Sequence, residues 1–307
     1  MWTIAAPKEA THHTYLMHQM LTLAALHIAH EQAQQRATYH ALAIHHQDLA
    51  IKAIRPKLGH ITAENASYLF ATSALLSMAV FGERALAAHT STAKPALEDL
   101  LDCFGLIQGM CDLRVKAYPY VLSGPFAPIL IPGTTVIPPQ PVYDVLLDRI
   151  PDAVAFIGAQ TDAPEEMQRE CLIQLFAFKD ILLHDRYPMQ DNRELRSLFF
   201  WPMNLPPGFP AWVRERRGPA LVLLALYAVL LRAAETVGEP EPTFWYFAGW
   251  AARVMGAVAE AVDDVWRPGI EWQWDFVFGP QAQAQVQVQA QVQQQHAALG
   301  EDAHMQL

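Results

Sequence analysis

The chain has 307 residues, of which 52% are hydrophobic and 17% charged, and its formal net charge is −10 at pH 7. This composition supplies enough apolar surface for a large core and excludes a chain that is disordered throughout. The 31 acidic residues outnumber the 21 basic ones, which excludes a long nucleic-acid interface because phosphate binding depends on clustered Lys and Arg.

The cysteines and the apolar runs indicate a reducing compartment and no membrane partner. Cys103, Cys111 and Cys171 form no CxxC pair, and such sparse spacing is typical of reduced, buried thiols. The N-terminus lacks a charged segment followed by a long apolar run. The strongest apolar stretch, 221–231, is short against the ~20 residues that a membrane helix needs, so we expect it to be a buried core helix.

The first part of the chain predicts three helices. Apolar residues recur at helical spacing over about 13–34, 36–54 and 63–81. Pro56 is expected to stop the second helix, because proline lacks the amide hydrogen and clashes with the preceding turn. Thr62 is expected to cap the third helix. The short connections predict that the three helices pack antiparallel.

The middle of the chain predicts further helices and two irregular segments. The helices are expected at about 96–110, 142–158 and 164–184, from the spacing of their apolar residues. Prolines are dense from 118 to 141 and again from 201 to 210. That density disfavours long helices and central strands in both segments, so we expect ordered but irregular loops.

The last third of the chain returns to long helices, expected at about 219–236 and 242–264. Beyond them, the run 281–295 contains only Gln, Ala and Val and has no face able to form a core. We therefore predict an all-α fold with two Pro-rich irregular segments, formed by one helical regulatory domain over 1–279. A disordered Gln-rich tail is predicted over 280–307.

Several segments occur in an order and spacing that resemble a known family. The more specific segments are 15–29, 61–65 and 69–71, together with Tyr39, Ala43, His46, Gln47 and Ala50, which precede an Arg-Pro pair at the end of the second predicted helix. The resemblance is weaker over 219–221, 245–246, 249–251 and 266–272. Together they cover nearly all of 10–275 and resemble the C-terminal domain of fungal binuclear zinc-cluster transcription factors of the sterol uptake control type. The resemblance implies a helical effector domain that forms homodimers and senses a lipid, typically a sterol.

The resemblance also implies a function in the nucleus as a transcriptional regulator or co-regulator without a cofactor. In that family an N-terminal Zn2Cys6 module binds DNA, and the six cysteines are missing from this sequence. DNA is therefore expected to be contacted only indirectly, or through a zinc cluster that this sequence lacks.

An aromatic stretch over 244–250 supplies candidate ligand-binding residues, Phe244, Phe247 and Trp250. The family resemblance favours an apolar pocket that takes a sterol-like or terpenoid-like molecule. The competing interpretation is that these side chains fill the core, as large aromatic residues commonly do. The sequence leaves both interpretations open.

The alternative function is a cyclase-type biosynthetic enzyme that reuses the apolar pocket of this fold. Glu98, Asp99 and Asp102 superficially resemble the Asp-rich magnesium site of class I terpene cyclases, but no second metal-binding set follows. His27 and His30 supply only two of the ~four ligands that a zinc site needs, so no metal is expected. The sequence contains no P-loop, GxSxG or Rossmann motif, which removes most cofactor-dependent and hydrolytic enzymes.

Overall fold

The described residues are helical, and no strand is found among them. The structure, a computed structural model of the chain, describes residues 4–87, 95–130, 141–186, 193–237 and 244–279. The prediction of an all-α fold is confirmed for these residues. The predicted disordered tail over 280–307 lies outside them.

The chain forms two compact units. Unit 1 comprises Met1–Gly133 together with Gly238–Ala248, and unit 2 comprises Thr134–Val237 together with Gly249–Leu307. Each unit is therefore built from two separate stretches of the sequence. The single regulatory domain over 1–279 stays a prediction.

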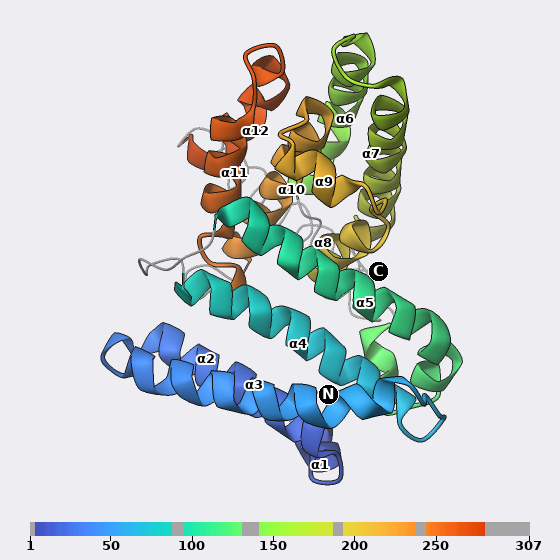
Figure 1. Cartoon of the computed structure of the whole chain (residues 1–307), viewed down its shortest axis with the longest axis vertical. Coiled ribbons are helices and arrows are strands. Elements are labelled where there is room, and N and C mark those ends of the chain that lie inside the picture. The colour runs from blue at the N-terminus through green and yellow to red at the C-terminus, as the bar shows by residue number, and fades with distance from the viewer. Residues whose placement is uncertain (1–3, 88–94, 131–140, 187–192, 238–243, 280–307) are drawn as a thin grey trace, which may run out of the picture. The chain divides into compact units, whose positions relative to one another are not determined.

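Unit 1 is built around four long helices, α2, α3, α4 and α5. Its elements are α1 (Ala5–Ala10), α2 (Thr14–Glu31), η1 (Ala33–Gln35), α3 (Arg36–Leu58), α4 (Ala66–Ala87), α5 (Ala96–Leu122), η2 (Ala127–Ile129) and η3 (Trp245–Phe247). Helix α2 packs along α3, and α4 packs against both α2 and α5 (Figure 1). Contacts of His18 with His46, and of Ala29 with Arg36, show that α2 and α3 run antiparallel as predicted.

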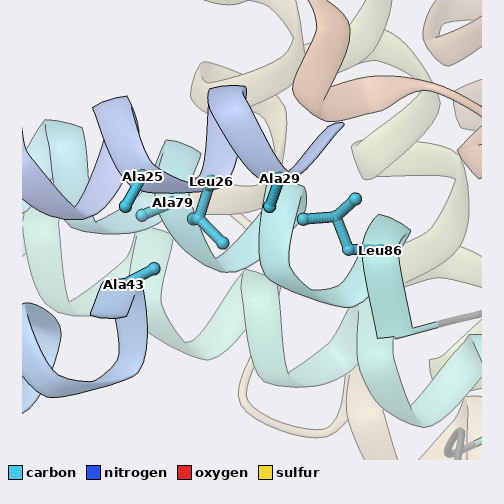
Figure 2. Close-up of a cluster of buried hydrophobic side chains, with 6 residues drawn as sticks. All are labelled: Ala25, Leu26, Ala29, Ala43, Ala79 and Leu86. Atoms are coloured by element: carbon cyan, nitrogen blue, oxygen red, sulfur yellow. The ribbon is translucent and has the colours of Figure 1, made fainter. Parts of the chain in front are cut away.

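Small side chains allow the helices of unit 1 to approach one another closely. Figure 2 shows a buried cluster drawn from α2, α3 and α4, formed by Ala25, Leu26, Ala29, Ala43, Ala79 and Leu86. Alanine at a helix interface leaves room for the facing backbone, and leucine then fills the remaining space. The alanine-rich sequence of these helices thus explains their tight packing.

The start of α4 differs from the prediction that Thr62 caps this helix, because the regular helix begins at Ala66 and Thr62 contributes its backbone groups. The Thr62 carbonyl accepts a hydrogen bond from the Ala66 amide at 2.9 Å. The Asn65 Oδ1 atom accepts one from the Thr62 amide at 2.8 Å. Asn65 therefore plays the part that Glu or Gln plays in a capping box.

In unit 2 the other helices pack around one apolar helix, α10. Its elements are α6 (Pro141–Ala159), α7 (Glu165–Asp185), α8 (Arg193–Met203), α9 (Phe209–Arg214), α10 (Gly218–Thr236), α11 (Trp250–Ala261), η4 (Arg267–Ile270) and α12 (Glu271–Phe278). Helix α10 contacts every other helix of this unit, and all its residues from Gly218 to Leu231 are buried. This confirms that the apolar run 221–231 belongs to a core helix.

Two helices are long and apolar enough to cross a membrane, judged by length and composition among the described residues. They are α4 and α10, and both are longer than the uninterrupted apolar run 221–231. In their most apolar windows, 72% of α4 and 89% of α10 is buried within the protein. Core helices of soluble proteins show the same burial, and the absence of a membrane partner stays a prediction.

Helices extend through prolines at which the sequence predicts a stop. Pro56, Pro119 and Pro202 lie within the last turns of α3, α5 and α8. Each proline removes one backbone N–H hydrogen bond, and the helix continues for one to three residues beyond it. The irregular segments predicted over 118–141 and 201–210 are therefore wrong where α5, α8 and α9 occupy them. The second half of the first segment lies outside the described residues.

The helix predicted over 242–264 is interrupted. Its described part consists of η3 and α11, separated by Ala248 and Gly249. Gly249 has φ +76°, a left-handed conformation that glycine adopts at little cost. The break coincides with the passage of the chain from unit 1 to unit 2. Helix α12, which follows η4, is not predicted by the sequence.

Candidate functional site

The three predicted ligand-binding residues are buried, but they belong to different units. Phe244 and Phe247 lie in unit 1 and are 4% and 0% exposed, whereas Trp250 lies in unit 2 and is 0% exposed. The aromatic stretch 244–250 is therefore divided between the two units. The ligand-binding role of all three residues stays a prediction.

In unit 1 the aromatic residues of η3 pack on α4. The ring of Phe247 meets that of Phe81 edge to face, with 4.9 Å between centroids. Phe244 and Phe247 both contact the ring of Tyr246. Burial raises the pKa of Tyr246, so its phenol is neutral at physiological pH. Edge-to-face pairs stabilise a core, and this packing is what the core interpretation predicts.

Trp245 is a less buried residue that attaches η3 to two helices of unit 1. Its indole stacks on His27 of α2 with 5.2 Å between centroids, and His30 lies at 5.5 Å. A Cβ atom at Gly82 of α4 would lie 3.0 Å from the indole, so the indole would have to shift to accommodate a larger residue there. Burial and then His27 lower the pKa of His30, which favours a neutral imidazole beside the indole.

In unit 2 Trp250 is the first residue of α11. The guanidinium carbon of Arg253 lies 4.9 Å from the centroid of its ring, within cation–π distance. The Glu235 Oε1 atom of α10 accepts a hydrogen bond from the Ala251 amide at 2.8 Å, which satisfies a free donor at the helix start. Burial raises the pKa of Glu235, although the bonds from Ala251 and Arg232 oppose the shift.

A group of ionisable side chains that the sequence does not reveal lies at one end of unit 1. We call Glu9, His13, Tyr15 and Tyr68 the tyrosine–histidine cluster. The Tyr68 hydroxyl donates to Glu9 Oε2 at 2.9 Å, and the Tyr15 hydroxyl lies 3.2 Å from His13 Nδ1. The imidazole of His13 stacks on Tyr68 with 3.6 Å between centroids. Lys57 lies over the ring of Tyr15 at 5.9 Å.

Burial shapes the chemistry of the tyrosine–histidine cluster. It raises the pKa of Tyr15 to about 12 and is the main cause that raises the pKa of Tyr68. It also lowers the pKa of His13. Two neutral phenols thus adjoin a neutral imidazole at physiological pH, an arrangement suited to hydrogen bonding with an uncharged polar group. Sequence reasoning missed it because Tyr68 lies on α4, far along the chain from the other members.

Two of the three acidic residues considered for catalysis, Asp99 and Asp102, lie beside Arg84. Asp99 is 2% exposed, and its Oδ1 atom lies 3.5 Å from Nε of Arg84, while Oδ2 of Asp102 lies 3.9 Å from Nη2. The positive charge of Arg84 offsets the negative charge that a magnesium site would need. Burial and Asp99 raise the pKa of the Cys103 thiol, which disfavours a thiolate nucleophile. Among the described residues, no group of three or more His, Cys, Asp or Glu is placed to hold a metal.

Comparisons with family models, with curated proteins and with solved structures find no match to this chain. The class that the fold defines is an all-α protein of two helical units.

Proposed function

We propose that the chain is a transcriptional regulator or co-regulator, built on the helical effector domain of fungal zinc-cluster regulators. The placement of the resembling residues supports this proposal. Tyr15, Leu16 and Leu26 of α2 are buried, as are Ala43 and Ala50 of α3. The segment that carries the most specific resemblance is therefore the part of the sequence that packs the helices of unit 1 together.

The proposed effector is an apolar sterol-like or terpenoid-like molecule. The chain is rich in large buried aromatic side chains, including Phe247 in unit 1 and Trp250 in unit 2. A ligand that binds one helix packing more tightly than another shifts the population toward that packing. The proposal includes a homodimer in the nucleus, with DNA reached through a partner or a zinc cluster.

The proposal is tested by fusing the whole chain to a heterologous DNA-binding domain in cells that carry a matching reporter gene. We expect reporter output to differ from that of the DNA-binding domain alone and to change when sterols or terpenoids are added. Replacement of Phe247 by Ala should abolish the effector response, whereas replacement of the exposed Tyr118 should not. Equal reporter output with and without the chain, at matched protein levels, contradicts regulation.

The tyrosine–histidine cluster favours a second candidate function, an enzyme that acts on a terpenoid or polyketide by proton transfer. Neutral phenols next to an imidazole are groups that donate and accept protons in general acid–base catalysis. Incubation of the purified chain with such substrates, followed by mass spectrometry, tests this candidate. A product that Tyr15→Phe and Tyr68→Phe both suppress supports the enzyme, and no turnover of any substrate contradicts it.

A further inference from the structure

Two histidines on neighbouring helices of unit 1 bring their ring nitrogens together. His18 of α2 and His46 of α3 have their Nδ1 atoms 3.1 Å apart, and their rings stack with 5.2 Å between centroids. Both side chains are half-buried. They belong to long antiparallel helices that pack closely along each other. The positions of the two imidazoles are therefore set by the helix packing rather than by a flexible loop.

The separation of the two nitrogens suits a shared metal ion. With metal–nitrogen bonds of about 2.0–2.1 Å, two ligands of one ion are about 3.3 Å apart in tetrahedral geometry and about 2.9 Å apart at a right angle. The observed 3.1 Å lies between these values. We propose that His18 and His46 bind one divalent transition-metal cation through their Nδ1 atoms and so link α2 to α3, with water completing the coordination.

The donor set defines the class of cation. Imidazole nitrogen suits zinc, copper and nickel, whereas calcium and magnesium prefer oxygen ligands. Only the neutral form of an imidazole can act as a metal ligand. The negative net charge of the chain also favours the approach of cations.

The simpler explanation for the pair is a direct hydrogen bond between imidazoles in opposite tautomers. A metal site and a direct hydrogen bond differ in whether a cation is required and in how each responds to the loss of one histidine. The hydrogen bond needs no added cation, and EDTA leaves it unaltered. The metal site needs both nitrogens, so that either histidine alone binds the ion weakly. This difference allows a direct experiment, which is independent of the proposed regulatory or catalytic function.

The experiment uses the whole chain, freed of metal by EDTA and titrated with zinc chloride in a calorimeter. We expect one zinc ion per chain and a rise in melting temperature that EDTA reverses. Asparagine keeps a polar side chain at each position but cannot replace the imidazole. His18→Asn and His46→Asn should therefore each weaken zinc binding by at least about tenfold. His60→Asn, at an exposed turn, serves as the matched control and should bind as the natural chain does.

A second measurement on the unaltered chain covers the case in which a variant fails to fold. Diethylpyrocarbonate modifies accessible imidazoles, and peptide mass spectrometry locates the modified residues. We expect zinc to protect His18 and His46 while His12 and His60 react as before. Zinc binding that persists in both Asn variants, equal protection of all histidines, or no stoichiometric binding would each overturn the proposal.

Discussion

Replacing Phe247 by Ala separates a ligand-binding role from a core role. The side chain is fully buried in unit 1 and meets Phe81 edge to face at 4.9 Å. If it is an ordinary core residue, its truncation should cost about 3–5 kcal/mol of unfolding free energy, because the surrounding side chains fill the cavity only in part. At about 2–4 °C per kcal/mol, the melting temperature of the free chain falls by on the order of 10 °C.

The assay is a thermal melt of each variant with and without a panel of sterols and terpenoids. A ligand present at 100 times its dissociation constant stabilises the folded chain by about 2.7 kcal/mol. If Phe247 lines the binding cavity, Phe247→Ala should lose most of this ligand-induced rise and destabilise the free chain less. Tyr118→Ala is the control in the same unit, because this side chain is 46% exposed and should change neither quantity.

The same comparison applies to Trp250→Ala in unit 2, which tests whether a ligand binds there instead. A large loss of stability with the ligand response intact identifies a core residue. If no member of the panel stabilises the natural chain, the reasoning from aromatic content to a ligand pocket is refuted. The apolar residues would then be explained by the core and by a dimer interface.

Three further predictions concern other features of the molecule. Gly218→Ala should destabilise the chain by about 1–3 kcal/mol in chemical denaturation, because the added Cβ atom would overlap the ring of Trp266. Gly256→Ala should stabilise the chain by about 0.5–1 kcal/mol, because Gly256 lies within a helix and has open space around its Cα atom. Equal effects of the two substitutions would contradict the packing at Gly218. The raised pKa of Glu235 implies a stability contribution that is present below its unfolded pKa of about 4.3 and lost as pH rises through the higher folded pKa. E235Q should therefore flatten the decline in stability above about pH 4.3, and an unchanged pH profile would exclude this residue as the cause. The chain alone should bind duplex DNA weakly and without sequence preference, and tight selective binding in a mobility-shift assay at physiological salt would contradict this.

Helical periodicity predicted the long helices well because their buried faces repeat regularly in the sequence. Helix α3 begins at Arg36 as expected, and α6, α7 and α10 begin and end within a residue or two of their predicted bounds. The errors come from single residues whose effect depends on position. Pro119 lies in the last turn of α5, which ends three residues later, and α6 continues past Pro151, so a proline alone does not mark the end of a helix here. Gly249 lies within an aromatic sequence that has helical spacing, so the sequence does not indicate a break there. In the structure Gly249 has a positive φ, and the chain passes from unit 1 to unit 2 at this residue.

The candidate sites were less predictable than the helices. Burial of Phe244 and Trp250 follows from their size and apolar character, but their assignment to different units depends on the path of the whole chain. Pairs such as His18 with His46 require the register between two helices, which periodicity alone does not specify. Hydrophobic spacing identifies the buried face of each helix, and the distances between polar atoms across helices come only from the packed structure.

The discontinuous path of unit 1 has a consequence for synthesis on the ribosome. Helices α1 to α5 emerge first, but η3 belongs to the same unit and is encoded after most of unit 2. Translation proceeds at about 5–20 residues per second, so Trp245 is synthesised on the order of ten seconds after the surface around Gly82 against which it packs. During that interval the nascent chain exposes an apolar surface that the finished protein covers, which makes it a natural place for a chaperone to bind.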